Sequence, residues 1–510
     1  MPQPPVSAPR QVSGLAAVMT TVAMGLGSAV AVGDLRILAA NISLVRNGLQ
    51  FSPGTTIFVS SLATLTLGAS VLGAGVLGDR YGMKRMFLAG AFAAVVFGIV
   101  GAAAPNVAVL MIARACIGVA FAFLSGLSLA IMNAVFPPER RAGAIAWFLA
   151  AVYAFGVLPA TVGGLLAERI GWRSGLLVTP VLAILVLLIT VRYVPETPRS
   201  PGRTDVAGLL LIAGSLIGVS YGVSQLQGGL RPASVVPILA GLLAGATFVW
   251  WEMRCDEPAL DLRIFASSRF SAVVGAGAVS NLVQGGSAIM VTFYLVVIRD
   301  QSTWMFALLF VPATLVSALA AVGAGRAAAR VGNGTVVVAG LLVLAASMLV
   351  RLIFDADTPI AVVGAVLALT AMGGAIIQTP QATVMMSSAP SSLGGVVSAV
   401  KAAVGGTFNG LGSALFSMFG IILFVRDAGA HLAGSGITPE QAGDVLSTTP
   451  GSSPLDPERT AWVISEATTS MLHVADVLNL SLAVVAVAGA VVIAVLFRRG
   501  RGAVIPPVSP

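Results

Sequence analysis

Two residues of opposite charge, Asp34 and Arg114, each lie inside a long apolar run of the sequence. A charged side chain at membrane depth is energetically costly, so it faces a cavity or a partner of opposite charge. Asp34 lies about six residues, or ~9 Å, from one end of its run, and Arg114 lies about eight residues, or ~12 Å, from the matching end of another. Because these depths agree, we expect the two side chains to meet.

This pair supports two interpretations. In the first, Asp34 takes up and releases a proton and Arg114 tunes its affinity, because a nearby cation favours a carboxylate whereas burial favours the neutral acid. In the second, the two residues form a structural ion pair near a membrane surface, and Arg36 extends its side chain to water. We take proton coupling by Asp34 and Arg114 as the working hypothesis.

Other side chains of the apolar runs are candidates for a substrate cavity. Lys401 is an ammonium inside such a run, where it either meets an anionic substrate or lipid headgroup or extends to the membrane face. The polar side chains among them either line the cavity or form hydrogen bonds between helices. The aromatic side chains of the fifth span either form a surface that attracts cations or pack against neighbouring helices. The candidates are Arg36, Trp147, Tyr153, Phe155, Asn281, Gln284, Gln378, Gln381, Lys401 and Asn409.

The sequence carries no pattern typical of an enzyme site. Its two histidines, His431 and His473, fall in or beside one polar segment, and no Gly-rich nucleotide-binding loop is present to supply ATP as a drive. We therefore expect a protein that is not an enzyme and holds no metal. Its only cofactor would be protons as the coupling ion.

Helices that cross a membrane must position these residues. Of 510 residues, 57% are hydrophobic and 9% charged, and the mean hydropathy is +0.97. Soluble proteins carry about 25% charged residues, and about 20 apolar residues span a bilayer. The apolar runs predict fourteen spanning helices, near residues 12–40, 54–75, 84–104, 106–135, 142–167, 174–192, 205–225, 233–251, 269–297, 302–325, 332–353, 359–387, 393–425 and 474–497.

The distribution of charge predicts the orientation of the chain. An even number of spans puts both termini on one side, and most of the 28 Lys and Arg residues lie in the loops of that side. Positive charge accumulates in cytoplasmic loops, so we expect both termini in the cytoplasm. These basic loops account for the net charge of +8, so the charge is not evidence for nucleic-acid binding.

Residues 75–85 read G-V-L-G-D-R-Y-G-M-K-R and separate the second apolar run from the third. Such charges cannot lie in hydrocarbon, so we expect a short loop at the cytoplasmic face. Gly75 and Gly82 let the backbone turn tightly, and Asp79 is an anchoring acid. The basic residues that hold this loop in the cytoplasm are Arg80, Lys84 and Arg85.

The pattern G-x-L-x-D-R-x-G-x-K-R resembles the loop between helices 2 and 3 of the major facilitator superfamily. Further stretches resemble the fourteen-helix drug:proton antiporters of that superfamily, and the likeness covers nearly the whole chain. Residues 114–118 are similar to the antiporter pattern R-x-x-Q-G, with Ile117 in place of Gln. Asp34 stands where the antiporters show D-x-T-x-x-N, with Arg36 in place of Thr and Ala39 in place of Asn.

Residues 159–164, Pro-Ala-Thr-Val-Gly-Gly, are similar to the G-P-x-x-G-G segment of antiporter helix 5. Pro159 is displaced by one residue, whereas Gly163 and Gly164 keep their places. Proline removes a backbone donor and glycine permits close packing, so we expect this segment to bend its helix.

The resemblance implies an all-α integral membrane protein with the major facilitator fold. Two six-helix bundles and two extra helices would make 14 transmembrane helices, with the substrate site between the bundles. The expected parts are an N-terminal bundle in residues 1–199, two inserted linker helices in 200–262, a C-terminal bundle in 263–500 with a long outer loop at 426–472, and a cytoplasmic tail at 501–510.

The resemblance also implies proton-coupled efflux, by antiport, of lipophilic cationic drugs or toxic compounds across the bacterial inner membrane. A transporter or flippase of a lipid or an endogenous metabolite stays open as an alternative. It is favoured by Arg36, Ile117 and Lys401, which depart from the antiporter pattern toward positive charge. The expected partners are a small lipophilic substrate or a lipid, and membrane lipids, with no nucleic acid, and the chain is expected to act as a monomer.

Asp79 is expected to connect the two bundles. We expect its carboxylate to meet the amino end of the thirteenth helix, near Ser391 and Ser392, where backbone donors are free. This contact would stabilise the outward-open state of a transporter.

Overall fold

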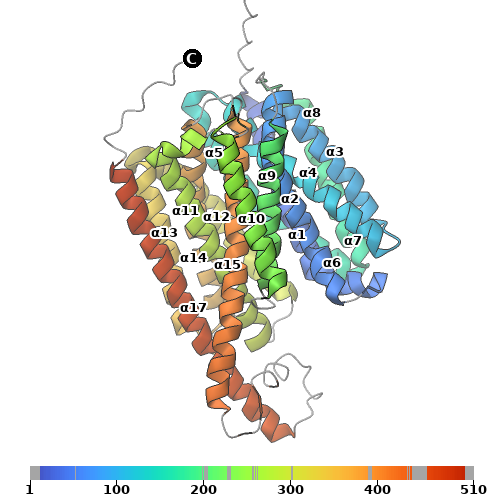
Figure 1. Cartoon of the computed structure of the whole chain (residues 1–510), viewed down its shortest axis with the longest axis vertical. Helices are drawn as coiled ribbons and strands as arrows, with labels where there is room; N and C mark the ends of the chain where they lie inside the picture. The colour runs from blue at the N-terminus through green and yellow to red at the C-terminus, as the bar shows by residue number, and fades with distance from the viewer. Residues whose placement is uncertain are drawn as a thin grey trace, which may run out of the picture.

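The fold is all-α and spans a membrane many times, which confirms the predicted class. The computed structural model describes residues 12–499 except 52, 198, 200–204, 227–230, 256, 257, 259, 261, 300–302, 389–392, 433, 434, 436, 439, 440 and 442–455. Within these residues, 14 helices are long and apolar enough to cross a membrane. Most of them run side by side along the long axis in Figure 1.

The N-terminal half contains the first six spans, and its fifth and sixth spans are each split into two helices. Its helices are α1 (Gly14–Leu49), α2 (Pro53–Tyr81), α3 (Met83–Ala102), α4 (Val107–Val135), α5 (Pro138–Gly156), α6 (Leu158–Arg169), α7 (Trp172–Leu176) and α8 (Val178–Tyr193).

Two further spans, α9 (Val206–Gln225) and α10 (Pro232–Glu252), lie in front of the junction between the halves in Figure 1. They pack on each other, and α9 also packs on α2 and α15. The C-terminal half contains η2 (Leu262–Ala266), α11 (Ser268–Phe293), η3 (Tyr294–Ile298), α12 (Thr303–Val331), α13 (Asn333–Val350), η4 (Arg351–Ile353), α14 (Ile360–Ser387), α15 (Gly394–His431) and α17 (Pro457–Arg499).

The same tight turn occurs once in each half. Gly82 alone separates α2 from α3 and has a φ of 102°, and Gly332 alone separates α12 from α13 and has a φ of 88°. Glycine adopts this backbone conformation at little cost, which allows a one-residue connection. The predicted loop at residues 75–85 is therefore wrong in extent, because the chain is helical on both sides of Gly82. We call the end of the bundle that contains these turns the motif end.

The helices at the opposite end are longer than the sequence predicts. α1 continues to Leu49, and α15 and α17 project beyond the other helices in Figure 1. The predicted outer loop at 426–472 is wrong at both edges, since α15 reaches His431 and α17 begins at Pro457. Apolar side chains of the two helices bury one another there, which extends the helix pair: Ala428, Leu432, Val463 and Ala467.

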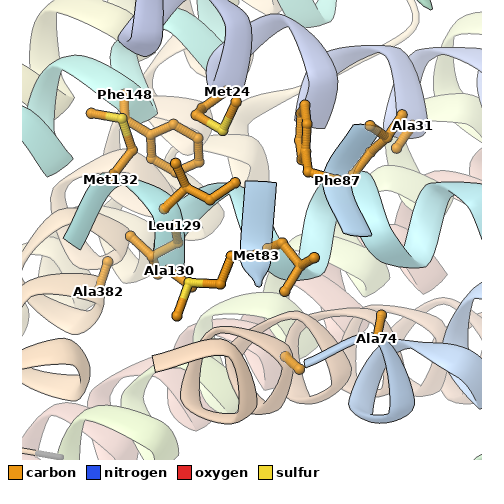
Figure 2. Packing of buried hydrophobic residues seen from close by; sticks show 14 of the residues in the cluster. Met24, Ala31, Ala74, Met83, Phe87, Leu129, Ala130, Met132, Phe148 and Ala382 are labelled. Atoms are coloured by element: carbon orange, nitrogen blue, oxygen red, sulfur yellow. The ribbon is translucent and has the colours of Figure 1, made fainter. Parts of the chain in front are cut away.

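The two halves are packed together at the motif end. One buried cluster includes Met24 and Phe148 of the N-terminal half and Ala382 of the C-terminal half, as Figure 2 shows. The first seven residues of α15, from Gly394 to Val400, are all buried. Further along α15, Asn409 is exposed. The junction between the halves is therefore closed at the motif end.

Candidate functional site

Broken helices flank Asp34. The fifth span is split into α5 and α6 next to Pro159, and the sixth is split into α7 and α8 next to Pro180. Proline lacks an N–H and its ring presses on the preceding turn, so a helix ends there. A Cβ on Gly33 would lie 2.5 Å from the Cβ of Pro159, so α1 passes against the first break. The predicted bend is thus a break, and it adjoins Asp34.

The two glycines that follow Pro159 differ in their surroundings. A Cβ on Gly163 would lie 2.7 Å from the side chain of Ile37, so this glycine permits the contact between α6 and α1. A Cβ on Gly164 would have no atom within 4 Å, so close packing does not explain that residue.

Asp34 and Arg114 are in direct contact, as their positions in the apolar runs predict. Arg114 Nη1 lies 2.6 Å from Asp34 Oδ2, and the side chains are only 3% and 1% exposed. Thr179, beside Pro180, donates a hydrogen bond of 2.5 Å to Asp34 Oδ1. The predicted end of the first helix was wrong, because α1 continues to Leu49, although the apolar span within it ends at Leu38.

The polar groups of this buried network are not all satisfied. Removing two charges from water costs several kcal/mol per ion, and the mutual attraction repays this only when all donors and acceptors are satisfied. Within the described part of the chain, Nε and Nη2 of Arg114 donate to no group. Apolar side chains would hold α1 and α4 together at lower cost. The pair is therefore suited to a change of charge.

The C-terminal half gathers polar side chains on α11, α14 and α15. Lys401 Nζ donates to Gln378 Oε1 at 2.6 Å, and Asn409 Nδ2 donates to the carbonyl of Asn281 at 3.4 Å. Gln284 bonds to Ser280 on its own helix. The structure thus brings most of the predicted polar candidates onto three adjoining helices.

The polar candidates of this half are not all directed into one space, as Gln381 shows. Gln381 is 2% exposed, and its side chain packs against Gly277 of α11. It belongs to a contact between helices. Lys401 and Asn409 are more accessible than Gln381, so they are the better candidates for a cavity.

One buried cation of this half was not predicted. Arg351 is 3% exposed, and its Nη2 donates to Thr370 Oγ1 at 2.8 Å, while Nη1 donates to the carbonyl of Ser287 at 3.4 Å. Both partners are neutral oxygens. Arg351 lies near the end of the predicted run 332–353, where a long basic side chain is expected to extend to water, so its burial leaves no signal in the sequence.

The predicted aromatic surface of the fifth span divides in two. Trp147 and Phe155 line a groove of about 850 Å³ formed by α1, α5 and α12 at the motif end. Tyr153 is partly buried and packs against the main core cluster instead. Arg36 is exposed, whereas Ile117, which replaces the Gln of the antiporter pattern, is 2% exposed and lies in the core.

Asp79 joins the two halves. Its Oδ1 accepts a hydrogen bond of 2.8 Å from the N–H of Gly395, and its Oδ2 accepts one of 3.0 Å from the N–H of Val396. These are free donors in the first turn of α15, where the helix dipole also favours a carboxylate. The predicted contact with this helix end is present, although Ser391 and Ser392 lie outside the described residues.

Other residues of the motif make contacts at this junction or within the N-terminal half. A Cβ on Gly75 would lie 2.6 Å from the carbonyl oxygen of Gly395, so a larger residue would force α2 and α15 apart. Arg85 lies 3.8 Å from Glu196, and Lys84 Nζ donates to the carbonyl of Val191 at 3.4 Å. Arg80 lies over the ring of the adjacent Tyr81, 5.5 Å from its centroid.

Thr179 and Arg351 are the two residues that sequence reasoning missed. The signal for Thr179 was a hydroxyl next to a proline inside an apolar run, since a helix break exposes polar atoms that need partners.

Two halves of six spans, a buried ion pair between broken helices and a junction closed at one end define a membrane transporter rather than an enzyme. The chain belongs to the Major Facilitator Superfamily, whose pattern matches residues 24–423.

Relatives of this chain include named efflux proteins. The multidrug efflux pump LfrA of Mycolicibacterium smegmatis is 26% identical over 91% of this chain and 93% of its own length. The tetracenomycin C resistance and export protein of Streptomyces glaucescens is 27% identical over 78% and 75%. The drug efflux pump JefA of Mycobacterium tuberculosis is 30% identical over 68% and 69%.

Solved structures agree in fold at low sequence identity. The human organic anion transporter MFSD10 has a TM-score of 0.59 at 13% identity, covering 93% of this chain and 100% of its own. The proton:xylose symporter XylE has a TM-score of 0.55 at 14% identity, covering 90% and 94%.

Proposed function

We propose that this chain exports lipophilic cationic compounds across the plasma membrane of a bacterium in exchange for protons. The observation that carries the proposal is the buried network of Asp34, Arg114 and Thr179 between two broken helices. The names of its relatives, which include a multidrug efflux pump and an antibiotic export protein, support a drug-like cargo. Both termini and the motif end lie in the cytoplasm in this proposal, following the excess of basic residues on that side. No cofactor other than the proton is needed.

The coupling follows from the charge of the pair. Ionised Asp34 and Arg114 together carry no net charge, whereas protonated Asp34 leaves the charge of Arg114 uncompensated. At a separation near 10 Å and an effective dielectric of about 20, that charge repels a bound cation by roughly 1.5 kcal/mol, about tenfold in affinity. Proton uptake therefore favours release of a cation, and proton release favours its binding.

The same charge logic separates this proposal from its alternative, a transporter or flippase of an anionic lipid or metabolite. The observation in favour of the alternative is Lys401, a cation of the C-terminal half that donates to a neutral oxygen of Gln378. An anion would bind better when Asp34 is protonated, so protons and an anion would move in the same direction. The sign of the coupling thus distinguishes the two functions.

Purified protein in vesicles tests the proposal. Flux of a lipophilic cationic dye and of a fluorescent anionic lipid is measured while a pH gradient is imposed in either direction. We expect the dye to move against the proton gradient in the wild type, Asp34→Asn to lose this response, and Asp34→Glu to retain part of it. Gradient-driven lipid movement without dye movement would establish the alternative. Unchanged gradient-driven dye flux in Asp34→Asn would remove Asp34 from the mechanism.

A further inference from the structure

The two junctions between the halves are related by the internal repeat of the fold. Residues 75–82 and 325–332 both begin with glycine and end with the glycine of a one-residue turn, and Arg80 corresponds to Arg330. Gly75 of α2 touches α15, and Gly325 of α12 touches α5, where its Cβ would lie 2.7 Å from that of Ala146. The pairs α2–α15 and α5–α12 are therefore equivalent junctions.

The two junctions differ in charge at two corresponding positions, because the second has Arg326 in the place of Val76 and Ala329 in the place of Asp79. At the first, Asp79 holds the amino end of α15 through two hydrogen bonds. At the second, the residue in the corresponding place is Ala329, which is exposed and carries no acceptor in its side chain. The second junction therefore lacks the carboxylate that connects the halves at the first.

The groove of about 850 Å³ lies at this second junction. Its body is apolar, with Val18 and Trp147 each 57% exposed and Leu319 76% exposed. Its rim carries Arg140 of α5 and Arg326 of α12, against the single acid Glu139. Exposed apolar side chains of a membrane-spanning segment face lipid, and basic pockets between spanning helices on the cytoplasmic side bind anionic headgroups.

We propose that this groove binds an anionic phospholipid of the cytoplasmic leaflet, with acyl chains along Trp147 and Leu319 and the phosphate between Arg140 and Arg326. The headgroup then supplies in trans the negative charge that Ala329 lacks. The walls come from both halves, so the groove is complete only while the motif end is closed. A ligand shifts an equilibrium toward the state that it binds better, and the lipid therefore stabilises the closed motif end. This inference rests on the proposed cytoplasmic orientation of that end.

The test reads binding at Trp147 directly and needs no transport. Protein is placed in nanodiscs of phosphatidylcholine that contain a minor fraction of lipid brominated on its acyl chains, either phosphatidylglycerol or phosphatidylcholine. Bromine quenches nearby tryptophan fluorescence, and the contribution of Trp147 among the six tryptophans is the difference from Trp147→Phe. Two arginines near the surface correspond to about thirtyfold preference for the anionic lipid. We expect quenching of Trp147 at about thirtyfold lower content of the glycerol lipid.

Variants test whether the quenching of Trp147 arises from lipid bound in the groove. Arg140→Gln/Arg326→Gln should erase the preference, whereas Arg269→Gln/Arg498→Gln, which removes two arginines from another pocket of the motif end, should retain it. Gly143 has open space beside it, so Gly143→Leu should fill the groove without a clash and remove quenching by both lipids. Equal quenching by the two lipids in the wild type, or an unchanged preference in Arg140→Gln/Arg326→Gln, would overturn the proposal. Loss of efflux coupling in Asp34→Asn leaves this outcome unaffected, so the two proposals fail separately.

Discussion

The two halves share a fold but hold their buried charges differently. Among the described residues of the halves, the buried acids Asp34 and Asp79 both belong to the N-terminal half. There, Asp34 pairs with a buried arginine, and Asp79 caps a helix of the other half. In the C-terminal half, Arg351 and Lys401 contact neutral oxygens instead. In the proposed function, the N-terminal half exchanges the proton at its core, and the C-terminal half supplies fixed polar and positive groups.

The largest expected effect is on the stability of the N-terminal half. Arg114→Met leaves the carboxylate of Asp34 buried without its cation, which typically costs about 3–5 kcal/mol. Thermal unfolding in detergent should show a marked loss of stability. The double variant Asp34→Asn/Arg114→Met removes both charges and should recover most of it. If the double variant is as unstable as the single one, the ion pair does not govern packing at this site.

The junction between the halves should respond next. Asp79→Asn replaces an acceptor of two backbone N–H groups by an amide, and hydrogen bonds to a charged group contribute about 1.5–3 kcal/mol. Spin labels at Tyr81→Cys and Val331→Cys, both exposed, report the separation of the halves at the motif end once Cys116 and Cys255 are replaced by Ser. We expect a shift toward longer distances in Asp79→Asn and none in the control Arg85→Gln. Identical distributions in both would show that Asp79 does not hold the motif end closed.

Two isosteric substitutions sharpen the comparison of the halves. Thr370→Val removes the hydroxyl that accepts from Arg351, which then keeps only the longer bond to Ser287, so we expect a loss of about 2 kcal/mol. Thr179→Val removes a donor to the carboxylate of Asp34, which keeps Arg114, so a loss of about 1.5 kcal/mol, at the lower end of the same range, is expected. Chemical unfolding of both variants measures the difference. A larger loss of stability for Thr179→Val than for Thr370→Val would contradict this comparison, because it would show that Asp34 is compensated less well than Arg351.

The smallest expected effect concerns cargo preference. Lys401→Met removes a positive charge from the C-terminal half, and at separations near 10 Å this is roughly 1.5 kcal/mol, or about tenfold tighter binding of a cation and about tenfold weaker binding of an anion. Competition between a cationic dye and an anionic amphiphile for binding to purified protein measures the ratio of the two affinities. Gln381→Met serves as the control, because Gln381 is buried in a helix contact. A ratio that is the same in both variants would place Lys401 away from the cargo.

Much of the fold follows from the sequence because hydrocarbon imposes strict rules. Each apolar run is long enough to cross a bilayer, and a charge such as Asp34 or Arg114 stands out against that background. The predicted helix ends were wrong where a helix extends beyond the hydrocarbon, because the rules on length and charge do not apply there. The residues around Asp79 are charged yet helical, because a helix continues past the membrane when its end packs on another helix.

The site was predicted in part for the same reason. A lone acid and a lone guanidinium at membrane depth are each costly unless they are paired. Their contact was therefore predictable from their positions alone. A hydroxyl such as Thr179 bonds to its own helix at almost any position, so only its place next to Pro180 marks it in the sequence, and that place does not identify Asp34 as its partner. The burial of Arg351 depends on the packing of three helices and is equally hidden.

Proton release on cargo binding tests the central claim most directly. A lipophilic cationic dye is added to unbuffered detergent solutions of wild-type and Asp34→Asn protein, and a pH indicator reports the protons that appear. The account predicts release by the wild type and none by Asp34→Asn, while calorimetry still detects dye binding to the variant. Equal proton release by both proteins, with equal binding, would contradict the assignment of Asp34 as the group that exchanges the proton.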